Sequence, residues 1–352
     1  MIRKVGCILI FFLLLTCFIA FGSANTRSPA EWEPVQTLIL RWPSFAFCGS
    51  EEKKVVVEII RQIAGKVGVT LIVNSETEQY DTLSVLRSEG INTEKIEFIQ
   101  WKGDDVWVRD YGPKFVVNSA FGELISIDWM YEPYRAQYDD AFTAFFSRMN
   151  GWRVKQLQVL FEGGNFMTDG NGTAFMCDSV YTKNLLFLGL PPRVVKERII
   201  DAFGLRNLIT LPSIWREHNK HVDVMAKAIS NSTVLVGKYT NGDANGLILD
   251  RWAKILRKHF EKIVRVELPP TYLLGDIEIF PTYLNSVIIN NMVLVPIYGV
   301  ETDARALEVY QREMPHHSIV GVYCKDLLES AGGALHCITT TVPSRAVQRG
   351  AL

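Results

Sequence analysis

The sequence repeats one arrangement of secondary structure, a hairpin followed by a helix and then a single strand. Four stretches place a turn rich in Asn, Asp, Gly or Ser between two apolar runs, the pattern of a β-hairpin, at 114–128, 165–178, 222–237 and 285–299. Helix-like stretches follow the hairpins at 138–149, 191–204, 246–260 and 303–313, and each is followed by a short apolar strand. Because one such unit cannot bury its apolar faces alone, neighbouring units are expected to pack on one another.

The chain has room for about five units, since the hairpins recur at intervals of about fifty residues. The stretch 36–74 fits a further unit, with a strand on each side of a helix at 51–66. We therefore expect an α/β fold, a five-bladed α/β propeller with a pseudo-fivefold repeat of hairpin–helix–strand units around an axial pocket. An ordinary two-domain α/β fold is the alternative. Long linkers and low-complexity tracts are absent, which predicts a single domain from about 27 to 345.

The N-terminus predicts export. Two basic residues at positions 3 and 4 precede an apolar run over 5–21, and small residues at 22–24 offer a cleavage site. We expect residues 1–24 to be a signal peptide and the mature protein to be secreted or periplasmic, without a stable membrane span; an uncleaved anchor is the alternative. The 37 Lys and Arg nearly balance 38 Asp and Glu, and no basic cluster points to nucleic acid.

The cysteines argue against a metal site. Cleavage of the leader would leave Cys48, Cys177, Cys324 and Cys337, without a CxxC pair or zinc-ligand spacing. A disulfide between Cys48 and Cys177 stays open. Cys177 and Cys324 lie in expected strands and fit buried core thiols. Cys337 differs because it follows Gly-Gly-Ala-Leu-His, where small residues keep bulk away and free N–H groups would lower the thiol pKa. Cys337 is therefore a candidate nucleophile.

Three further stretches carry polar residues at hairpin edges. Trp107 stands three residues before Asp110, and an aromatic face beside a carboxylate suits a flat cation. Glu162 follows an apolar strand and precedes two glycines that allow close backbone approach. His221 and Asp223 are two apart, so on a strand they would point to the same side, as needed to tune an imidazole for proton transfer. A solvated loop, an edge glutamate and a structural histidine are the respective alternatives.

Together these residues supply a nucleophile, an acid/base histidine and several carboxylates, which suit a guanidinium group. The planar cation needs carboxylates at its N–H edges, its central carbon needs a nucleophile, and its departing ammonia needs a proton. His336, next to Cys337 on an expected strand, would point to the opposite face and would not be the base.

The sequence resembles the agmatine deiminase and bacterial (Porphyromonas-type) peptidylarginine deiminase family, within the guanidino-group-modifying superfamily. The matching blocks are AEWEPVQTLILRWP (30–43), DVWVRDYGPKF (105–115), FEGGNFMTDGNGT (161–173), HVD (221–223), YLNSVIINNMVLVPIYG (283–299) and GGALHCIT (332–339). The resemblance implies the five-bladed pentein fold and hydrolysis of a guanidino group to a ureido group and ammonia, without metal or cofactor.

The resemblance also implies a role for each catalytic residue. Cys337 would attack the guanidinium carbon to give a covalent thiouronium. His221 would protonate the departing ammonia and then activate water. Asp110 and Asp223 would hold the guanidinium nitrogens, and Glu162 would complete the acidic ring beside His221.

The substrate expected from the resemblance is an arginine-type guanidinium. Trp107, Asn285 and Arg135 would bind it. Export, and Tyr111 after Asp110, favour peptidyl or free arginine as substrate and citrulline as product, although Arg135 stands alone where the peptidylarginine branch carries two arginines. An agmatine deiminase giving N-carbamoylputrescine is the main alternative; an amidinotransferase and a non-catalytic guanidine-binding protein are further ones. The oligomeric state is open.

Overall fold

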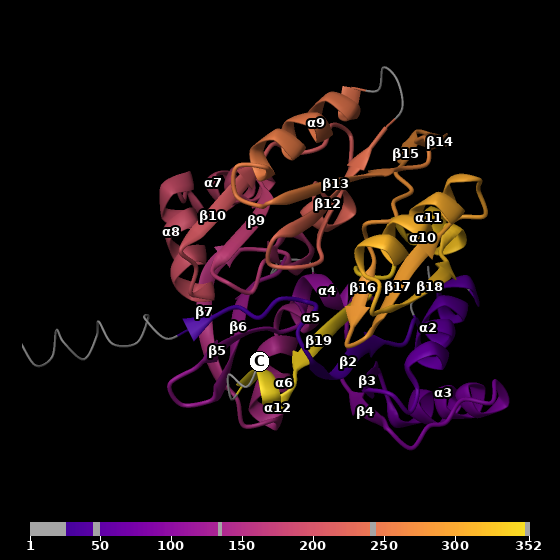
Figure 1. Ribbon diagram of the computed structural model, residues 1–352. Helices are drawn as coiled ribbons and strands as arrows, with labels where there is room; N and C mark the ends of the chain where they lie inside the picture. Colours follow the sequence, from indigo (N-terminus) through magenta and orange to yellow (C-terminus); the bar gives the residue numbers. More distant parts are fainter. Residues whose placement is uncertain (1–25, 45–49, 133–135, 240–243, 349–352) are drawn as a thin grey trace, which may run out of the picture.

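The computed structural model describes residues 26–44, 50–132, 136–239 and 244–348 (Figure 1). The predicted signal peptide, Cys48 and Arg135 lie outside the described residues, and what was expected of them stays a prediction. Within the described ranges, none of the helices is both long and apolar enough to cross a membrane.

Five sheets share one pattern of pairing. In each, a first strand pairs antiparallel with a second, and the second pairs parallel with a third. The five sets are β5 (Lys114–Asn118), β6 (Glu123–Met130) and β7 (Arg153–Leu160); β8 (Met167–Thr168), β9 (Thr173–Cys177) and β10 (Asn207–Leu211); β11 (Ala226–Ala228), β12 (Thr233–Lys238) and β13 (Lys262–Glu267); β16 (Val287–Ile289), β17 (Met292–Ile297) and β18 (Ser318–Tyr323); and β19 (Thr339–Pro343), β2 (Val35–Arg41) and β3 (Gly68–Val73). The four predicted hairpins and the mixed α/β class are confirmed.

Two sheets carry an additional edge strand, and one short hairpin stands apart. β1 (Thr26–Arg27) pairs with β5, and β4 (Ile96–Gln100) pairs with β3. β14 (Tyr272–Leu274) and β15 (Ile277–Ile279) form a separate two-stranded hairpin that the sequence pattern did not indicate.

The sheets lie around a common centre near α4, and most helices lie towards the outside (Figure 1). The helices are α2 (Ser50–Ile63), α3 (Glu76–Ser88), α4 (Val108–Tyr111), α5 (Gln137–Asp140), α6 (Phe142–Met149), α7 (Ser179–Leu188), α8 (Pro192–Phe203), α9 (Ala244–Leu256), α10 (Thr302–Glu313), α11 (Lys325–Ala331) and α12 (Arg345–Gln348), with 3₁₀ turns η1 (Gly163–Asn165) and η2 (Val222–Val224). The helices expected after the four hairpins are present, whereas α3, α7 and α11 were not expected.

The two ends of the described chain meet in one sheet. β19, near the C-terminus, pairs antiparallel with β2, with Thr339 opposite Leu40. It supplies the hairpin partner that the N-terminal unit lacks in its own sequence. Cys337 lies two residues before β19, so this pairing brings the candidate nucleophile to the centre of the molecule.

Local sequence accounts for several element boundaries. α8 begins at Pro192, whose fixed φ suits the first turn, and ends before Gly204, which has φ 61°. α3 is capped by Ser75, which accepts a hydrogen bond from the Glu78 amide. The turn between β16 and β17 places Asn290 at φ 54°, a conformation that Asn tolerates better than most residues.

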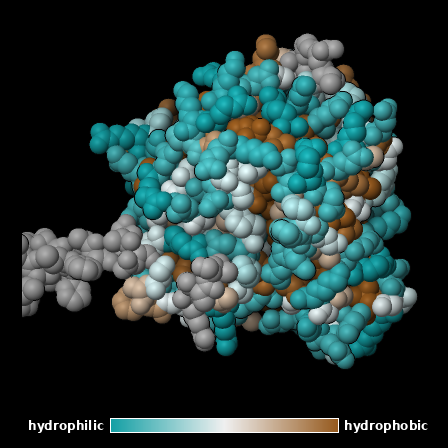
Figure 2. Space-filling view, viewed as in Figure 1, coloured by the Kyte–Doolittle hydropathy of each residue, from teal (hydrophilic) through white to brown (hydrophobic). Residues whose placement is uncertain are grey.

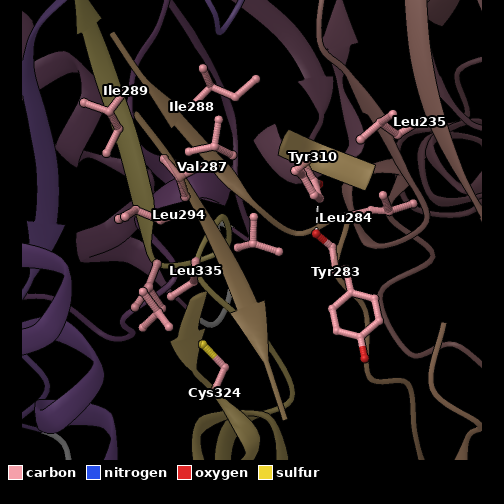
Figure 3. Packing of buried hydrophobic residues seen from close by; sticks show 14 of the residues in the cluster. Leu235, Tyr283, Leu284, Val287, Ile288, Ile289, Leu294, Tyr310, Cys324 and Leu335 are labelled. Carbon is pink, nitrogen blue, oxygen red and sulfur yellow. Dashed lines mark hydrogen bonds between the residues drawn. The ribbon is translucent and has the colours of Figure 1, made fainter. Parts of the chain in front are cut away.

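Apolar side chains from the sheets and helices fill the interior. Figure 3 shows one part of this core, which includes Val287, Ile289, Leu294, Cys324 and Leu335. Each fully buried side chain of this size contributes about 1.5–3 kcal/mol relative to exposure. On the face shown in Figure 2, hydrophilic residues predominate and hydrophobic ones gather mainly in the depressions between them.

Candidate active site

A pocket of about 590 Å³ contains most of the predicted site residues. Trp107, Asp110, Glu162, Asn285 and Cys337 all line it. His221 and Asp223 are almost completely buried and lie against Gly164: a Cβ added to Gly164 would be 2.7 Å from Nδ1 of His221 and 3.1 Å from Oδ2 of Asp223. The fold therefore brings together residues that are up to 230 positions apart in the sequence, from Trp107 to Cys337.

Cys337 lies in a tight turn after α11. Gly332 ends that helix with φ 81°. A Cβ on the next residue, Gly333, would lie 2.5 Å from the Trp107 ring and 3.2 Å from Cβ of Cys337. Only glycine lets the chain pass between the indole and the thiol, which explains the glycine pair in the sequence.

Asn285 holds the backbone around the thiol. Its Oδ1 accepts hydrogen bonds from the amides of His336 at 3.0 Å and Cys337 at 3.3 Å, and its Nδ2 donates to Sγ of Cys337 at 3.3 Å. We had expected Asn285 to bind substrate. It does line the pocket, but its described contacts are to the turn that carries Cys337.

The thiol is not activated in the way that the sequence suggested. Burial raises the pKa of Cys337 well above its usual range, and the negative charges of Asp223 and Asp110 raise it further. Hydrogen bonds from the Ala334 backbone and from Asn285 act in the opposite direction but do not overcome burial. Nearby N–H groups therefore do act to lower this pKa, as the sequence suggested, but the net shift is upward because burial and the two carboxylates outweigh them.

Asp110 is fixed by its backbone and by Gly164. It lies in the short helix α4, its carbonyl accepts a hydrogen bond from Nε1 of Trp129 at 2.9 Å, and its Oδ1 accepts one from the Gly164 amide at 2.9 Å. Burial raises the pKa of Asp110 to about 7, Glu162 and Asp223 add to the shift, and His221 opposes it.

His221 lies between two carboxylates. Its Nε2 is 3.3 Å from Oε2 of Glu162, and its Nδ1 is 3.7 Å from Oδ1 of Asp110. Burial alone would lower the pKa of His221, but Asp110 and Glu162 outweigh it and raise this pKa to about 10. Near neutral pH the imidazole therefore carries two protons and can donate one to a leaving group.

Glu162 has a second partner that the sequence did not indicate. Nζ of Lys183, in α7, lies 2.6 Å from Oε1 of Glu162. Burial would raise the pKa of Glu162, but His221 and Lys183 lower it to about 2. Glu162 is thus a fixed anion beside the imidazolium, and not an exposed edge residue.

Asp223 is paired differently from the sequence prediction. Residues 222–224 form the turn η2 instead of a strand, and Oδ2 of Asp223 lies 2.6 Å from Nδ1 of His336. Asp223 acts on His221 through its charge, which raises the pKa of the imidazole. Burial would raise the pKa of Asp223, but His336 lowers it. Oδ1 of Asp223 is buried without a hydrogen-bond partner among the described residues, so it can accept an N–H from a ligand.

His336 is held away from the thiol by two carboxylates. Its Nε2 lies 2.9 Å from Oε2 of Glu31, and its Nδ1 faces Asp223. It was expected to point away from Cys337 because of strand alternation, but the segment is a turn, and these two contacts fix the ring instead. Glu31 belongs to the first block of the family resemblance, although no role had been assigned to it.

The rest of the pocket wall is acidic. Beyond Asp110 and Glu162, five carboxylates line it, and no Lys or Arg is found among its described lining residues; the five are Asp105, Glu132, Glu217, Glu278 and Glu329. Glu217 is buried, and its Oε2 has no hydrogen-bond partner in the part of the chain that the structure describes. Burial raises the pKa of Glu217 above its usual value.

The described residues contain no group of three or more His, Cys, Asp or Glu side chains arranged to hold a metal ion. The chemistry that the site can perform with its own groups is nucleophilic attack by Cys337, proton transfer by His221 and charge neutralisation by the carboxylates.

Comparison with known proteins agrees with the geometry. The model of the Porphyromonas-type peptidyl-arginine deiminase family matches residues 27–343. A curated protein of Marinomonas sp. (strain MWYL1), named "Putative agmatine deiminase", is 25% identical over 91% of this chain and 95% of its own. The blocks that carried the resemblance, from residue 30 to residue 339, lie within the range that the family model matches.

Solved structures share the fold. An agmatine deiminase of C. jejuni, solved with substrate bound, superposes with a TM-score of 0.80 at 21% identity and covers 91% of this chain and 96% of its own. An agmatine deiminase of Enterococcus faecalis gives a TM-score of 0.79 at 23% identity, with the same coverage of both chains.

Proposed function

This chain belongs to the Porphyromonas-type peptidyl-arginine deiminase family and is a hydrolase of guanidino C–N bonds, and we propose that its substrate is agmatine, which it converts to N-carbamoylputrescine and ammonia. Agmatine is arginine without the carboxylate, so it carries a guanidinium at one end and an ammonium at the other. This was the alternative to peptidyl or free arginine in the sequence analysis, and the pocket now favours it.

The acidic wall of the pocket carries this proposal. With Cys337 at the guanidinium end, the remaining described wall offers carboxylates and no Lys or Arg. A distal ammonium gains from these charges, whereas the carboxylate of free or C-terminal arginine meets like charge and no Lys or Arg among the described lining residues. Oε2 of Glu217, buried and without a described partner, is the acceptor that we assign to the ammonium.

Binding of the guanidinium prepares the nucleophile. Its N–H groups donate to Asp110 and to the free Oδ1 of Asp223. The positive charge offsets the two carboxylates that raise the pKa of Cys337, so the thiol loses its proton to solvent as the substrate arrives. The nucleophile is thereby active only in the presence of the cation.

The reaction then proceeds in two halves. The thiolate of Cys337 forms an S–C bond to the central carbon, His221 gives a proton to the departing nitrogen, and the C–N bond breaks to release ammonia and leave a thiouronium. In the second half, neutral His221 takes one proton from water while the oxygen attacks the same carbon. The C–S bond then breaks as the remaining hydroxyl proton passes to solvent, giving the ureido product, the Cys337 thiolate and protonated His221.

The test compares substrates. Mature protein is incubated with agmatine, free arginine and a dipeptide ending in arginine, and ammonia and ureido product are measured. We expect kcat/KM for agmatine to exceed that for the other two at least 100-fold, about 2.7 kcal/mol. The Cys337→Ala variant should give no product. A preference for either arginine substrate would overturn the agmatine assignment, and no turnover of any of them would overturn the deiminase role.

We also propose that the five sheets close into a five-bladed propeller forming one domain over 27–345. The pairing of β19 with β2 supports closure because it joins the two ends of the series. A single calorimetric transition, with equal calorimetric and van't Hoff enthalpies, is expected for one cooperative domain. Two separate transitions would contradict it.

Export is a separate proposal, based on the N-terminal sequence. The basic pair and apolar run within residues 1–24 support a cleaved signal peptide. N-terminal sequencing of the protein made in its own host should begin at Asn25. A chain that retains Met1 would contradict this.

A further inference from the structure

A second cavity, of about 70 Å³, lies behind the turn that carries Cys337. It shares no lining residue with the substrate pocket. The two are nevertheless adjacent through the chain, because Arg109 and His336 line the cavity whereas their neighbours Asp110 and Cys337 line the pocket.

Arg109 connects this cavity to the catalytic turn. Its amide donates a hydrogen bond to the carbonyl of Cys337 at 3.1 Å, and its Nε donates to the carbonyl of His336 at 3.1 Å. The side chain is only 4% exposed, and its Nη2 is buried with no hydrogen-bond partner among the described residues. A buried guanidinium nitrogen without an acceptor is costly, which indicates that an acceptor is missing.

Lys114 lines the same cavity and has no direct ion-pair partner among the described residues. Its Nζ lies 5.8 Å from the centre of the Phe166 ring, and none of the described acidic side chains forms an ion pair with it. Burial lowers the pKa of Lys114 to about 7, the charge of Arg109 adds to this shift, and the charges of Glu31 and Asp223 oppose it. Two cations therefore face one small cavity.

The carboxylates that line the cavity are already occupied. Glu31 accepts hydrogen bonds from Nζ of Lys227 at 2.7 Å and from the Ile288 amide at 2.9 Å, as well as facing His336. Glu33 pairs with Arg27 at 2.6 Å and accepts a hydrogen bond from the Ala30 amide. Glu31 acts on both cations at longer range, but neither glutamate forms a described hydrogen bond with Nη2 of Arg109 or Nζ of Lys114.

We propose that this cavity is a binding site for one small anion, a halide or a short carboxylate, held between Arg109 and Lys114. The volume of about 70 Å³ suits an ion of this size and excludes nucleotides and sugars. The anion would supply the missing acceptor to the guanidinium that fixes the carbonyls of His336 and Cys337. It would therefore stabilise the catalytic turn from the side opposite to the substrate.

The test measures thermal stability, so it does not depend on the proposed deiminase activity. Unfolding of the whole mature protein is followed at about pH 6, where Lys114 is protonated, in sodium gluconate whose anion is too large for the cavity. Chloride, formate or acetate then replaces gluconate at constant ionic strength. We expect Tm to rise by about 2–6 °C and to saturate, as binding to one site requires.

Two variants assign the site. Lys114→Gln removes the charge but keeps a polar side chain, and Lys114→Met removes both the charge and the polarity. Neither variant should show the saturable rise of Tm. Lys66→Met, which removes an exposed lysine whose Nζ contacts the carbonyl of Gln62, should keep it. Because Gln and Met differ in polarity, at least one variant is expected to fold, as checked by circular dichroism.

The proposal is overturned by either of two results. The first is a rise that grows linearly with salt and does not saturate in the wild type, which would mean general salt effects with only water in the cavity. The second is an equal saturable rise in the wild type and in a folded Lys114 variant, which would place the ion elsewhere.

Discussion

His221 and Glu162 form the contact that sets the charge of the acid/base residue: Nε2 and Oε2 are 3.3 Å apart, with the imidazole buried and the carboxylate partly buried. Glu162 lies in the connection that precedes β8, and His221 lies in the connection that precedes β11. Their pairing keeps the imidazole protonated, as a proton donor to ammonia requires.

Replacing Glu162 by Gln should move the alkaline limb of the kcat profile to lower pH. Glu162 raises the pKa of His221 both as hydrogen-bond acceptor and as an anion, so its loss leaves burial less opposed and the imidazole deprotonates earlier. Lys183→Met is the matched control, because removing a nearby positive charge should shift the limb the other way. The profile of kcat is measured from about pH 6 to 10.5; an alkaline limb unmoved in Glu162→Gln would refute the pairing.

Replacing Asn285 by Ala should reduce kcat by roughly 10- to 100-fold, about 1.4–2.8 kcal/mol, with a smaller change in KM. The variant leaves the amides of His336 and Cys337 without their acceptor and removes the donor to Sγ. Because that donor lowers the pKa of Cys337, its loss should also shift thiol alkylation by iodoacetamide to higher pH. An unchanged alkylation profile would show that Asn285 does not act on the thiol.

The acid limb of kcat/KM should lie near pH 7, the pKa of Asp110 in the free protein. Bound guanidinium favours the anion, so the corresponding limb of kcat should lie at lower pH. Asp110→Asn should lose most of kcat/KM, since the charge-assisted contact disappears. Coincident acid limbs for kcat and kcat/KM would argue against contact between Asp110 and the cation.

The same group gives a stability prediction. The pKa of Asp110 is raised from 3.8 to about 7, so the folded protein binds more protons than the unfolded chain between these values. Its contribution to the free energy of unfolding is therefore fully present below pH 3.8 and is lost as pH rises through 7. Between pH 3.8 and about 7, Tm should therefore fall less steeply with pH in Asp110→Asn than in the wild type. Equal slopes for the two proteins would contradict the raised pKa of Asp110.

A structural feature could be predicted from the sequence when the residues that form it are close together along the chain. The hairpins were predictable because turn residues such as Asn290 mark them locally. The partner of β2 was not, because β19 lies about 300 residues away and pairing register leaves no local trace. Likewise Glu162 stood out by its position after a strand, whereas Lys183 contacts it only because α7 packs beside β7.

The surroundings of two predicted site residues could not be foreseen for the same reason. Asp223 does act on His221 by charge, as their positions in sequence suggested, but the hydrogen bond of its carboxylate goes to His336, more than a hundred residues away. The activation of Cys337 was inferred from flanking glycines, although burial and carboxylates contributed by distant segments dominate its pKa. The pKa of a buried group depends on charges that the folded pocket brings together, so the residues next to it in sequence are not enough to predict it.

Replacing Glu217 by Gln should raise KM for agmatine by roughly tenfold or more, since a charge-assisted contact is worth about 1.5–3 kcal/mol. KM for arginine should stay the same or fall. Glu278→Gln is the matched control, because Glu278 lines the same pocket but already pairs with Arg216 at 3.3 Å. Equal effects of both changes on agmatine would show that the wall acts through its total charge and that Glu217 holds no specific position.

Replacing Gly164 by Ala should abolish turnover while leaving a folded protein. A Cβ there would lie 2.7 Å from Nδ1 of His221 and 2.9 Å from Oδ1 of Asp110, closer than carbon can approach either atom, so the catalytic side chains must move apart. Gly321→Ala is the control: its Cβ would meet only side-chain carbons of Ile297 and Leu307, the nearest at 3.1 Å. We expect kcat/KM to fall at least 100-fold in the first variant and less than threefold in the second, with Tm lowered by comparable amounts. If Gly164→Ala retains activity, the acid/base pair does not converge at this glycine, and the assignment of His221 must be revised.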